Sequence, residues 1–193
     1  MISTSNIPYL PQDVCSTGQH EAAVAVDDNN DRHEILLVRV KAGKIEKMRT
    51  TKCQHTCTVL AHHDGHLYVA ARSALHMYDM AGGQCRQLYS DKTGEKTVAR
   101  CAISHDGSRI YITNHTHGQL STQNKGGTKL STFNLLEMRY PATPHVTAQG
   151  HMFVTCYGRN TVVQVTEREE QPADRDNTGW EKQRSDFTKV IVH

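Results

Sequence analysis

A glycine-containing hairpin recurs along this 193-residue chain, and its spacing limits the folds that the chain can adopt. Three copies are centred on Gly65, Gly107 and Gly150, which lie 42 and 43 residues apart. Each glycine is followed by apolar and aromatic residues: Leu67-Tyr68-Val69, Ile110-Tyr111-Ile112 and Met152-Phe153-Val154. A weaker copy precedes them at Gly18. A polar turn followed by such a segment indicates a β-hairpin, so the chain is a hairpin repeat.

A second glycine anchor lies in the same register. Gly82-Gly83 follows the hairpin at Gly65, and Gly126-Gly127 follows the hairpin at Gly107. Each unit therefore contains four short strands in about 40–45 residues, the size of one β-propeller blade. A single blade cannot bury both faces of its sheet, and stacking neighbouring blades explains why the unit recurs. The alternative is a β-sandwich whose hairpins are regular by accident.

The repeat predicts an all-β fold and one domain over residues 1–193. The domain is a β-propeller arc of about four four-stranded blades plus one extra strand, forming part of a six-bladed propeller. The predicted blades cover residues 9–52, 53–95, 96–138 and 139–185, and residues 186–193 are the first strand of a further blade. Open edge strands favour association, so closure by further blades or by self-association is expected.

Composition excludes few classes of function. A net charge of +2 favours no partner class, and 37% hydrophobic residues is typical of a globular domain. No apolar run approaches the ~20 residues that span a bilayer, so no membrane partner is expected. The first residues carry no basic and apolar secretory pattern. We therefore expect a cytoplasmic protein whose six cysteines are reduced thiols.

Two stretches resemble known propeller repeats. GHMFVTCYGRNTVVQVTE, residues 150–167, resembles the NHL repeat, and DGSRIYITN, residues 106–114, resembles the related YVTN repeat. The resemblance covers residues 56–167 well and residues 15–50 weakly. It implies a ring of six blades, as in tripartite-motif NHL proteins, whose propellers bind proteins or RNA. The chain has no RING or B-box pattern and no heptad coiled coil.

Loops on one face of the disc are the candidate binding site, because propeller function usually resides in such loops. We expect the loops after each second strand and the segments entering each first strand to share this face. They contribute Arg72, Arg100, His115, His117, Arg139, Tyr140, Tyr157 and Arg159. Arginine, histidine and tyrosine suit phosphate contact, base stacking or capture of an acidic peptide. The alternative is a set of ordinary solvated loops.

A secondary basic patch is expected on the rim of the first blade. It consists of Lys41, Lys44, Lys47, Arg49 and Lys52, with Glu46 as the one acid among them. Such a patch could attract nucleic acid or an acidic protein. The alternative is a charged outer strand that keeps the edge of the sheet soluble.

No catalytic or metal motif is visible. The thirteen histidines match no zinc pattern, and no nucleophile has a signature context. Asp64 and Asp106 are expected to form turns. The sequence therefore predicts a non-catalytic scaffold that binds a protein through one face, with no cofactor, no metal and no enzyme activity. Single-stranded RNA binding is the alternative, and a metal-dependent propeller lactonase or lyase is a further one.

Overall fold

The fold consists of four antiparallel sheets. The computed structural model describes residues 4, 6–7, 10–28, 30–134, 140–167 and 187–192. These residues form sixteen strands and one short 3₁₀ helix, η1 (Tyr157–Arg159). In every sheet the four strands follow chain order, each paired with the next. The prediction of an all-β chain with four four-stranded blades is confirmed.

The strands of the four blades have the following bounds. Blade 1 contains β1 (Pro11–Gly18), β2 (Glu21–Asp27), β3 (His33–Lys41) and β4 (Lys44–Lys52). Blade 2 contains β5 (Val59–His63), β6 (His66–Ala70), β7 (Ala74–Asp79) and β8 (Gln84–Ser90). Blade 3 contains β9 (Arg100–Ile103), β10 (Arg109–Asn114), β11 (Gln119–Asn124) and β12 (Lys129–Asn134). Blade 4 contains β13 (Pro141–Val146), β14 (Met152–Cys156), β15 (Thr161–Glu167) and β16 (Phe187–Val192).

The last strand corrects one prediction. β16 pairs antiparallel with β15, with Ile191 opposite Val163, so it is the outer strand of blade 4. Residues 186–193 therefore do not begin a further blade, and blade 4 does not end at residue 185. The physical reason is loop length. Nineteen residues separate β15 from β16, against two to four between the corresponding strands of the other blades.

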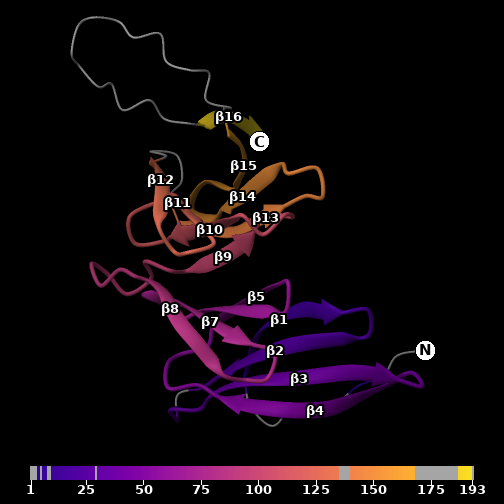
Figure 1. Ribbon diagram of the computed structural model, residues 1–193. Helices are drawn as coiled ribbons and strands as arrows, with labels where there is room; N and C mark the ends of the chain where they lie inside the picture. The colour runs from indigo at the N-terminus through magenta and orange to yellow at the C-terminus, as the bar shows by residue number, and fades with distance from the viewer. Residues whose placement is uncertain are drawn as a thin grey trace, which may run out of the picture.

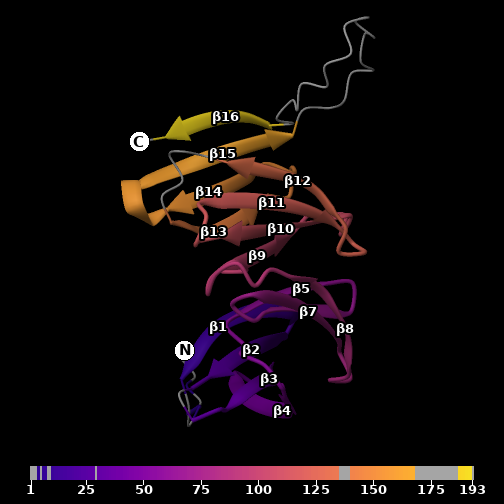
Figure 2. The ribbon, with the colours of Figure 1, turned by 90° about the vertical axis from the view of Figure 1, so that its left-hand side faces the viewer.

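The blades are arranged as an open arc. Their first strands, β1, β5, β9 and β13, contact one another in that order. Figure 1 and Figure 2 both show blade 1 at one end of the arc and blade 4 at the opposite end, with blades 2 and 3 between them. Hydrogen bonds between neighbouring blades include two that involve first strands. The Leu60 amide donates to Asp13 Oδ2 over 2.9 Å, and the Thr113 hydroxyl donates to the Ala142 carbonyl over 2.9 Å.

The core lies between the blades, because alternate side chains of each strand point to opposite faces of its sheet. On β10, Ile110 and Ile112 pack with Leu75 of blade 2, whereas Tyr111 packs with Val154 of blade 4. A third cluster joins blade 1 to blade 2. Full burial of such an aliphatic side chain stabilises the fold by roughly 1.5–3 kcal/mol. The three clusters therefore hold the four blades in register.

Candidate functional site

A cavity of about 490 Å³ lies where the first strands of the four blades begin. We call it the axial cavity. Its wall combines the starts of these strands, the segments leading into them and the loops after the second strands. It is lined by Gln12, Thr58, Arg72, Lys96, Val98, Ala99, Arg100, His115, Pro141, Ala142 and Tyr157. All four blades thus contribute to one site.

The structure brings together half of the predicted face residues. Arg72, Arg100, His115 and Tyr157 line the axial cavity. Tyr140 is adjacent, because its ring stacks on His115 with centroids 4.7 Å apart and planes 29° apart. Five of the eight predicted residues therefore lie at or beside one cavity.

Three other predicted residues are not among the lining residues. The His117 ring points toward the segment before β9, where its Nε2 lies 2.9 Å from Thr93 Oγ1. Arg139 lies outside the described residues. Arg159 ends η1, and its side chain is likewise outside the described part of the chain.

Sequence reasoning missed Lys96, Gln12 and Thr58. Lys96 lies four residues before β9, and its carbonyl accepts a 2.9 Å hydrogen bond from the His115 amide. That backbone bond places the segment beside the loop that carries His115. A wider window before each first strand would have included Lys96. Nothing in the residue types at positions 12 and 58 indicates a site.

His115 is the group in the cavity whose charge state is most affected by its surroundings. Partial burial lowers its pKa, because the charged imidazolium loses solvation. The positive charges of Lys96 and Arg100 lower the pKa further. The ring is therefore neutral at pH 7, with a nitrogen lone pair available to accept a proton.

The backbone of Arg72 is in a conformation that arginine rarely adopts. Its φ is 57°, in the left-handed region. The equivalent loops of the other blades also contain one left-handed residue, and these are Asp31, Gly118 and Asn160. Glycine, asparagine and aspartate tolerate this region, whereas other residues lose about 1 kcal/mol there. Arg72 therefore combines this conformation with a position in the cavity wall.

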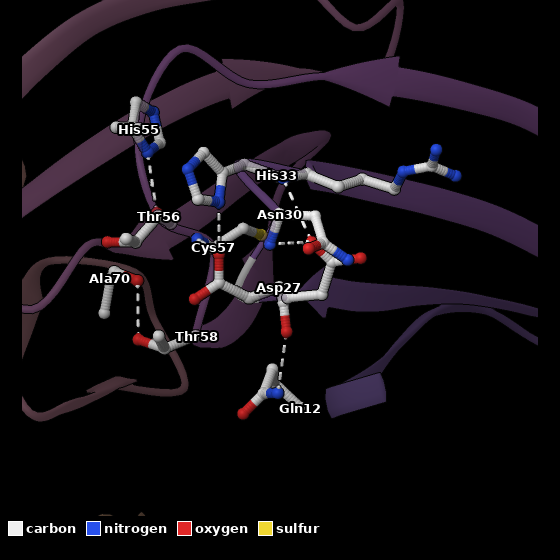
Figure 3. A network of polar contacts seen from close by, with 11 residues as sticks. Gln12, Asp27, Asn30, His33, His55, Thr56, Cys57, Thr58 and Ala70 are labelled. Atoms are coloured by element: carbon white, nitrogen blue, oxygen red, sulfur yellow. Dashed lines mark hydrogen bonds and ion pairs between the residues drawn. The ribbon is translucent and has the colours of Figure 1, made fainter. Parts of the chain in front are cut away.

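A polar network anchors the wall between blades 1 and 2. Figure 3 shows Asp27 at its centre, paired with His33 and receiving a 3.4 Å hydrogen bond from the Cys57 amide. The Gln12 side-chain amide donates to the Asp27 carbonyl over 3.0 Å, and the Thr58 hydroxyl donates to the Ala70 carbonyl over 2.9 Å. Both cavity residues are thereby held in fixed orientations.

The basic patch lies on the outer rim, as expected. Lys41 ends β3, and the other four residues belong to β4, the outer strand of blade 1. The lysines are exposed. Arg49 differs, because its guanidinium donates to the Met80 carbonyl of blade 2 and so joins two blades. Whether the patch binds a partner stays a prediction.

The axial cavity does not fit a divalent cation. Three cationic side chains line it, no carboxylate does, and the described part of the chain holds no group of three His, Cys, Asp or Glu that could coordinate a metal. All six cysteines are free thiols. Among the described residues, no helix has the length and apolar character needed to cross a membrane.

No protein family and no curated protein matches the sequence. Solved structures do match. A streptogramin B lyase is 14% identical with a TM-score of 0.64, and the match covers 81% of this chain and 51% of that one. A periplasmic gluconolactonase from Pseudomonas aeruginosa is 11% identical (TM-score 0.64; 83% and 54% covered). A putative 6-phosphogluconolactonase from Bacteroides uniformis is 9% identical (TM-score 0.68; 97% and 58% covered).

The chain thus spans about half the length of the structures that it resembles. The NHL assignment is not confirmed, because no family matches. The prediction of a non-catalytic scaffold and the prediction that the chain is not an enzyme are corrected, because these structural neighbours are named as lyases and lactonases. Loop composition misled that prediction, since arginine, histidine and tyrosine serve binding and catalysis equally. At these identities the likeness shows the fold, and the chain is a β-propeller arc of four blades.

Proposed function

We propose that the axial cavity is the active site of a hydrolase that opens a small, negatively charged lactone. The observation that carries this proposal is a neutral imidazole, His115, in a cavity lined by Arg72, Lys96 and Arg100. A neutral imidazole can act as general base at neutral pH. Three cations favour an anionic substrate and can stabilise negative charge that develops in the transition state.

The proposed reaction begins with water bound beside His115. The imidazole takes a proton from this water as its oxygen bonds to the lactone carbonyl carbon. Lys96 and Arg100, which already act on the charge of His115, stabilise the oxyanion of the tetrahedral intermediate. The bond from the carbonyl carbon to the ring oxygen then breaks, and the ring oxygen receives the proton from the imidazolium. The product is a hydroxy acid, which ionises and releases one proton.

Arg72 and Tyr157 are assigned to substrate binding. The Arg72 carbonyl accepts a 2.7 Å hydrogen bond from the Val98 amide, so Arg72 lies beside the segment that carries Lys96 and Arg100. Its side chain lines the same cavity and can pair with a phosphate or carboxylate of the substrate. Tyr157 is 81% exposed, which leaves its ring free to pack on the substrate as it enters. The names of the neighbours support this class, since two of them are lactonases by name. The proposed reaction uses no metal, because the described cavity lining does not suit one.

The test is proton release from glucono-δ-lactone and its 6-phosphate, followed at constant pH with the 193-residue chain. We expect hydrolysis above the uncatalysed rate, faster for the phosphorylated lactone. His115→Gln should lower kcat/KM by roughly 10²–10⁴-fold, the usual contribution of a general base. His117→Gln is the matched control and should retain the rate, because this ring does not line the cavity. Equal rates for both variants, or no rate above background, would contradict the proposal.

The same assay separates hydrolysis from elimination. Hydrolysis in ¹⁸O-labelled water places one labelled oxygen in the product carboxylate. A lyase would open the ester without incorporating solvent oxygen and would leave a carbon–carbon double bond. The NHL-like and YVTN-like resemblance of residues 150–167 and 106–114 stays a prediction and adds nothing to this chemistry.

A further inference from the structure

The face of blade 1 that points away from blade 2 is apolar, and no sheet among the described residues covers it, while Ile7 packs against its centre. A groove of about 610 Å³ runs over it, lined by Ile7, Val14, Val24, Val38, Val40 and Ile45 among others. Val14 is 62% exposed and Val40 is 51% exposed. We call this surface the open face of blade 1. Apolar patches of this kind on soluble proteins usually mark an interaction site.

The surface has the character of a blade interface. Between blades 2 and 3, and between blades 3 and 4, aliphatic side chains from facing sheets form a buried cluster. On blade 1, Ala23 and Ala25 face blade 2 in the same way. The alternate residues Val24 and Val26 form a small buried cluster on the open face, against which Ile7 and Val38 pack. The described residues supply no second sheet for this face, and Val14 and Val40 beside the cluster stay exposed. The open face of blade 1 is therefore half of a fourth interface.

The other half is available at the opposite end of the arc. On β15, Val163 and Val165 are buried against blade 3. Val162 points to the other face of that sheet and is 37% exposed. Phe153, whose partner on β15 is Gln164, is half-buried on that face as well. The free face of blade 4 is thus equivalent to the faces by which blades 1, 2 and 3 each contact the next blade in the chain.

We propose that two copies of this chain close head-to-tail into one ring, with blade 4 of each copy packed on blade 1 of the other. If the contact between successive blades within one chain is repeated between two chains, the free face of blade 4 meets the open face of blade 1. Two copies supply eight blades, within the four to eight of known propellers. The chain covers 51–58% of three propellers that it resembles, so two copies supply about the length of one complete propeller.

Ring closure also completes the axial cavity. In one chain the wall runs from Gln12 of blade 1 to Tyr157 of blade 4 and stops at the two open ends of the arc. In the ring the second copy supplies the remaining wall. The assembly is tested by mass, so its failure is distinguishable from failure of the proposed hydrolase.

The experiment is native mass spectrometry with light scattering on the purified chain. The expected mass is that of two chains of 21.6 kDa each. Val14→Lys and Val162→Lys each place a charge in both contacts of the ring, and both variants should be monomeric. An equimolar mixture of the two variants should recover a dimer, because one of its two contacts joins unmodified faces. Leu130→Lys is the matched control, since Leu130 is 51% exposed on an internal blade, and it should remain dimeric.

Three results would overturn the proposal. A monomeric wild-type chain would show that the open face of blade 1 is not covered by a second copy. An unlimited series of oligomers would show that the head-to-tail contact does not close. A Val162→Lys variant that stays dimeric would show that two blade 1 faces pair with each other. Circular dichroism confirms that each variant keeps its sheets, and the wild-type mass decides the question even if a variant fails to fold.

Discussion

Arg72 combines an unfavourable backbone conformation with a position in the cavity wall. Its left-handed φ is typical of the aspartate, glycine and asparagine found in the equivalent loops. In the proposed hydrolase Arg72 binds the substrate, so stability and binding respond in opposite directions to the same substitution. The trade-off is a known property of strained residues at functional sites.

Arg72→Asn should therefore raise the free energy of unfolding by about 1 kcal/mol, because asparagine tolerates the left-handed region. The same change should raise KM for the phosphorylated lactone roughly ten- to hundredfold through loss of a charged hydrogen bond. Urea denaturation and initial rates measure the two effects. Arg72→Lys is the control: it keeps both the strain and the charge, so the unfolding free energy should not rise. A stabilised Arg72→Asn with unchanged KM would remove Arg72 from the binding site.

At the residue scale, Arg72, Arg100, His115 and Tyr157, which the sequence register groups on one face, line the same cavity. His117 follows His115 by two residues but turns toward Thr93. Loop side chains have no strand alternation to fix their direction, so their orientation depends on contacts distant in sequence. The lowered pKa of His115 also could not be predicted, since it depends on partial burial first and then on the charges of Lys96 and Arg100 from another segment.

Among the elements, the hairpins between third and fourth strands carry contacts between blades as well as turns. Gly127 lies in such a hairpin with a φ of 86°. A Cβ there would lie 2.3 Å from the Leu88 carbonyl oxygen of blade 2. Gly65 has a similar φ of 71°, but a Cβ there would have no atom within 4 Å. Comparing these two glycines separates the cost of a left-handed backbone conformation from the cost of a steric clash with the neighbouring blade.

Gly65→Ala should lower the free energy of unfolding by about 1 kcal/mol, the cost of the left-handed conformation alone. Gly127→Ala should lower it by roughly 3 kcal/mol, because a backbone carbonyl of the neighbouring blade must also move. Chemical denaturation of both variants measures the difference. Equal losses would mean that the blade 2 carbonyl moves aside freely.

The glycine anchors were sufficient to predict the hairpins and the four strands of each blade. They could not predict that Gly127 packs on Leu88, because that contact joins strands of different blades. They also misassigned residues 187–192, since a fixed spacing cannot allow for nineteen residues between β15 and β16. Turn chemistry is local and visible in sequence, whereas loop length and contacts between blades are not.

For the whole molecule, the interface between blades 1 and 2 links stability to pH. His55 and His76 stack there with ring centroids 3.7 Å apart. The Tyr78 hydroxyl lies 2.8 Å from His55 Nε2, and the Gln84 amide lies 3.3 Å from His76 Nδ1. The pKa of His76 is lowered to about 4, mainly by burial and to a smaller extent by the charge of the adjacent His55. Burial likewise lowers the pKa of His55, on which the charges of His33 and Asp27 also act.

In the unfolded chain, both histidines have a pKa near 6.5 and bind protons as the pH falls below that value. In the folded chain, both rings stay neutral to a lower pH, because their pKa values are lowered. Their contribution to stability is complete above pH 6.5 and is lost as the pH falls toward 4. His76→Gln should make the free energy of unfolding less dependent on pH between 7 and 4.5. His20→Gln, at an exposed turn of blade 1, should leave the dependence unchanged. Equal slopes for wild type and His76→Gln, by urea denaturation at several pH values, would contradict this assignment.

The axial cavity and the blade interfaces draw on largely separate sets of positions, with Val98 common to both. The cavity mainly uses residues in loops and at the starts of strands, such as Arg72, Lys96 and His115, whereas the clusters between blades mainly use alternate residues within strands. In the proposed hydrolase, substrate preference can therefore diversify through loop positions that the packing between blades does not constrain. A combinatorial library over these loop positions should yield mostly folded proteins, and selection from it could sample many esters on one unchanged scaffold.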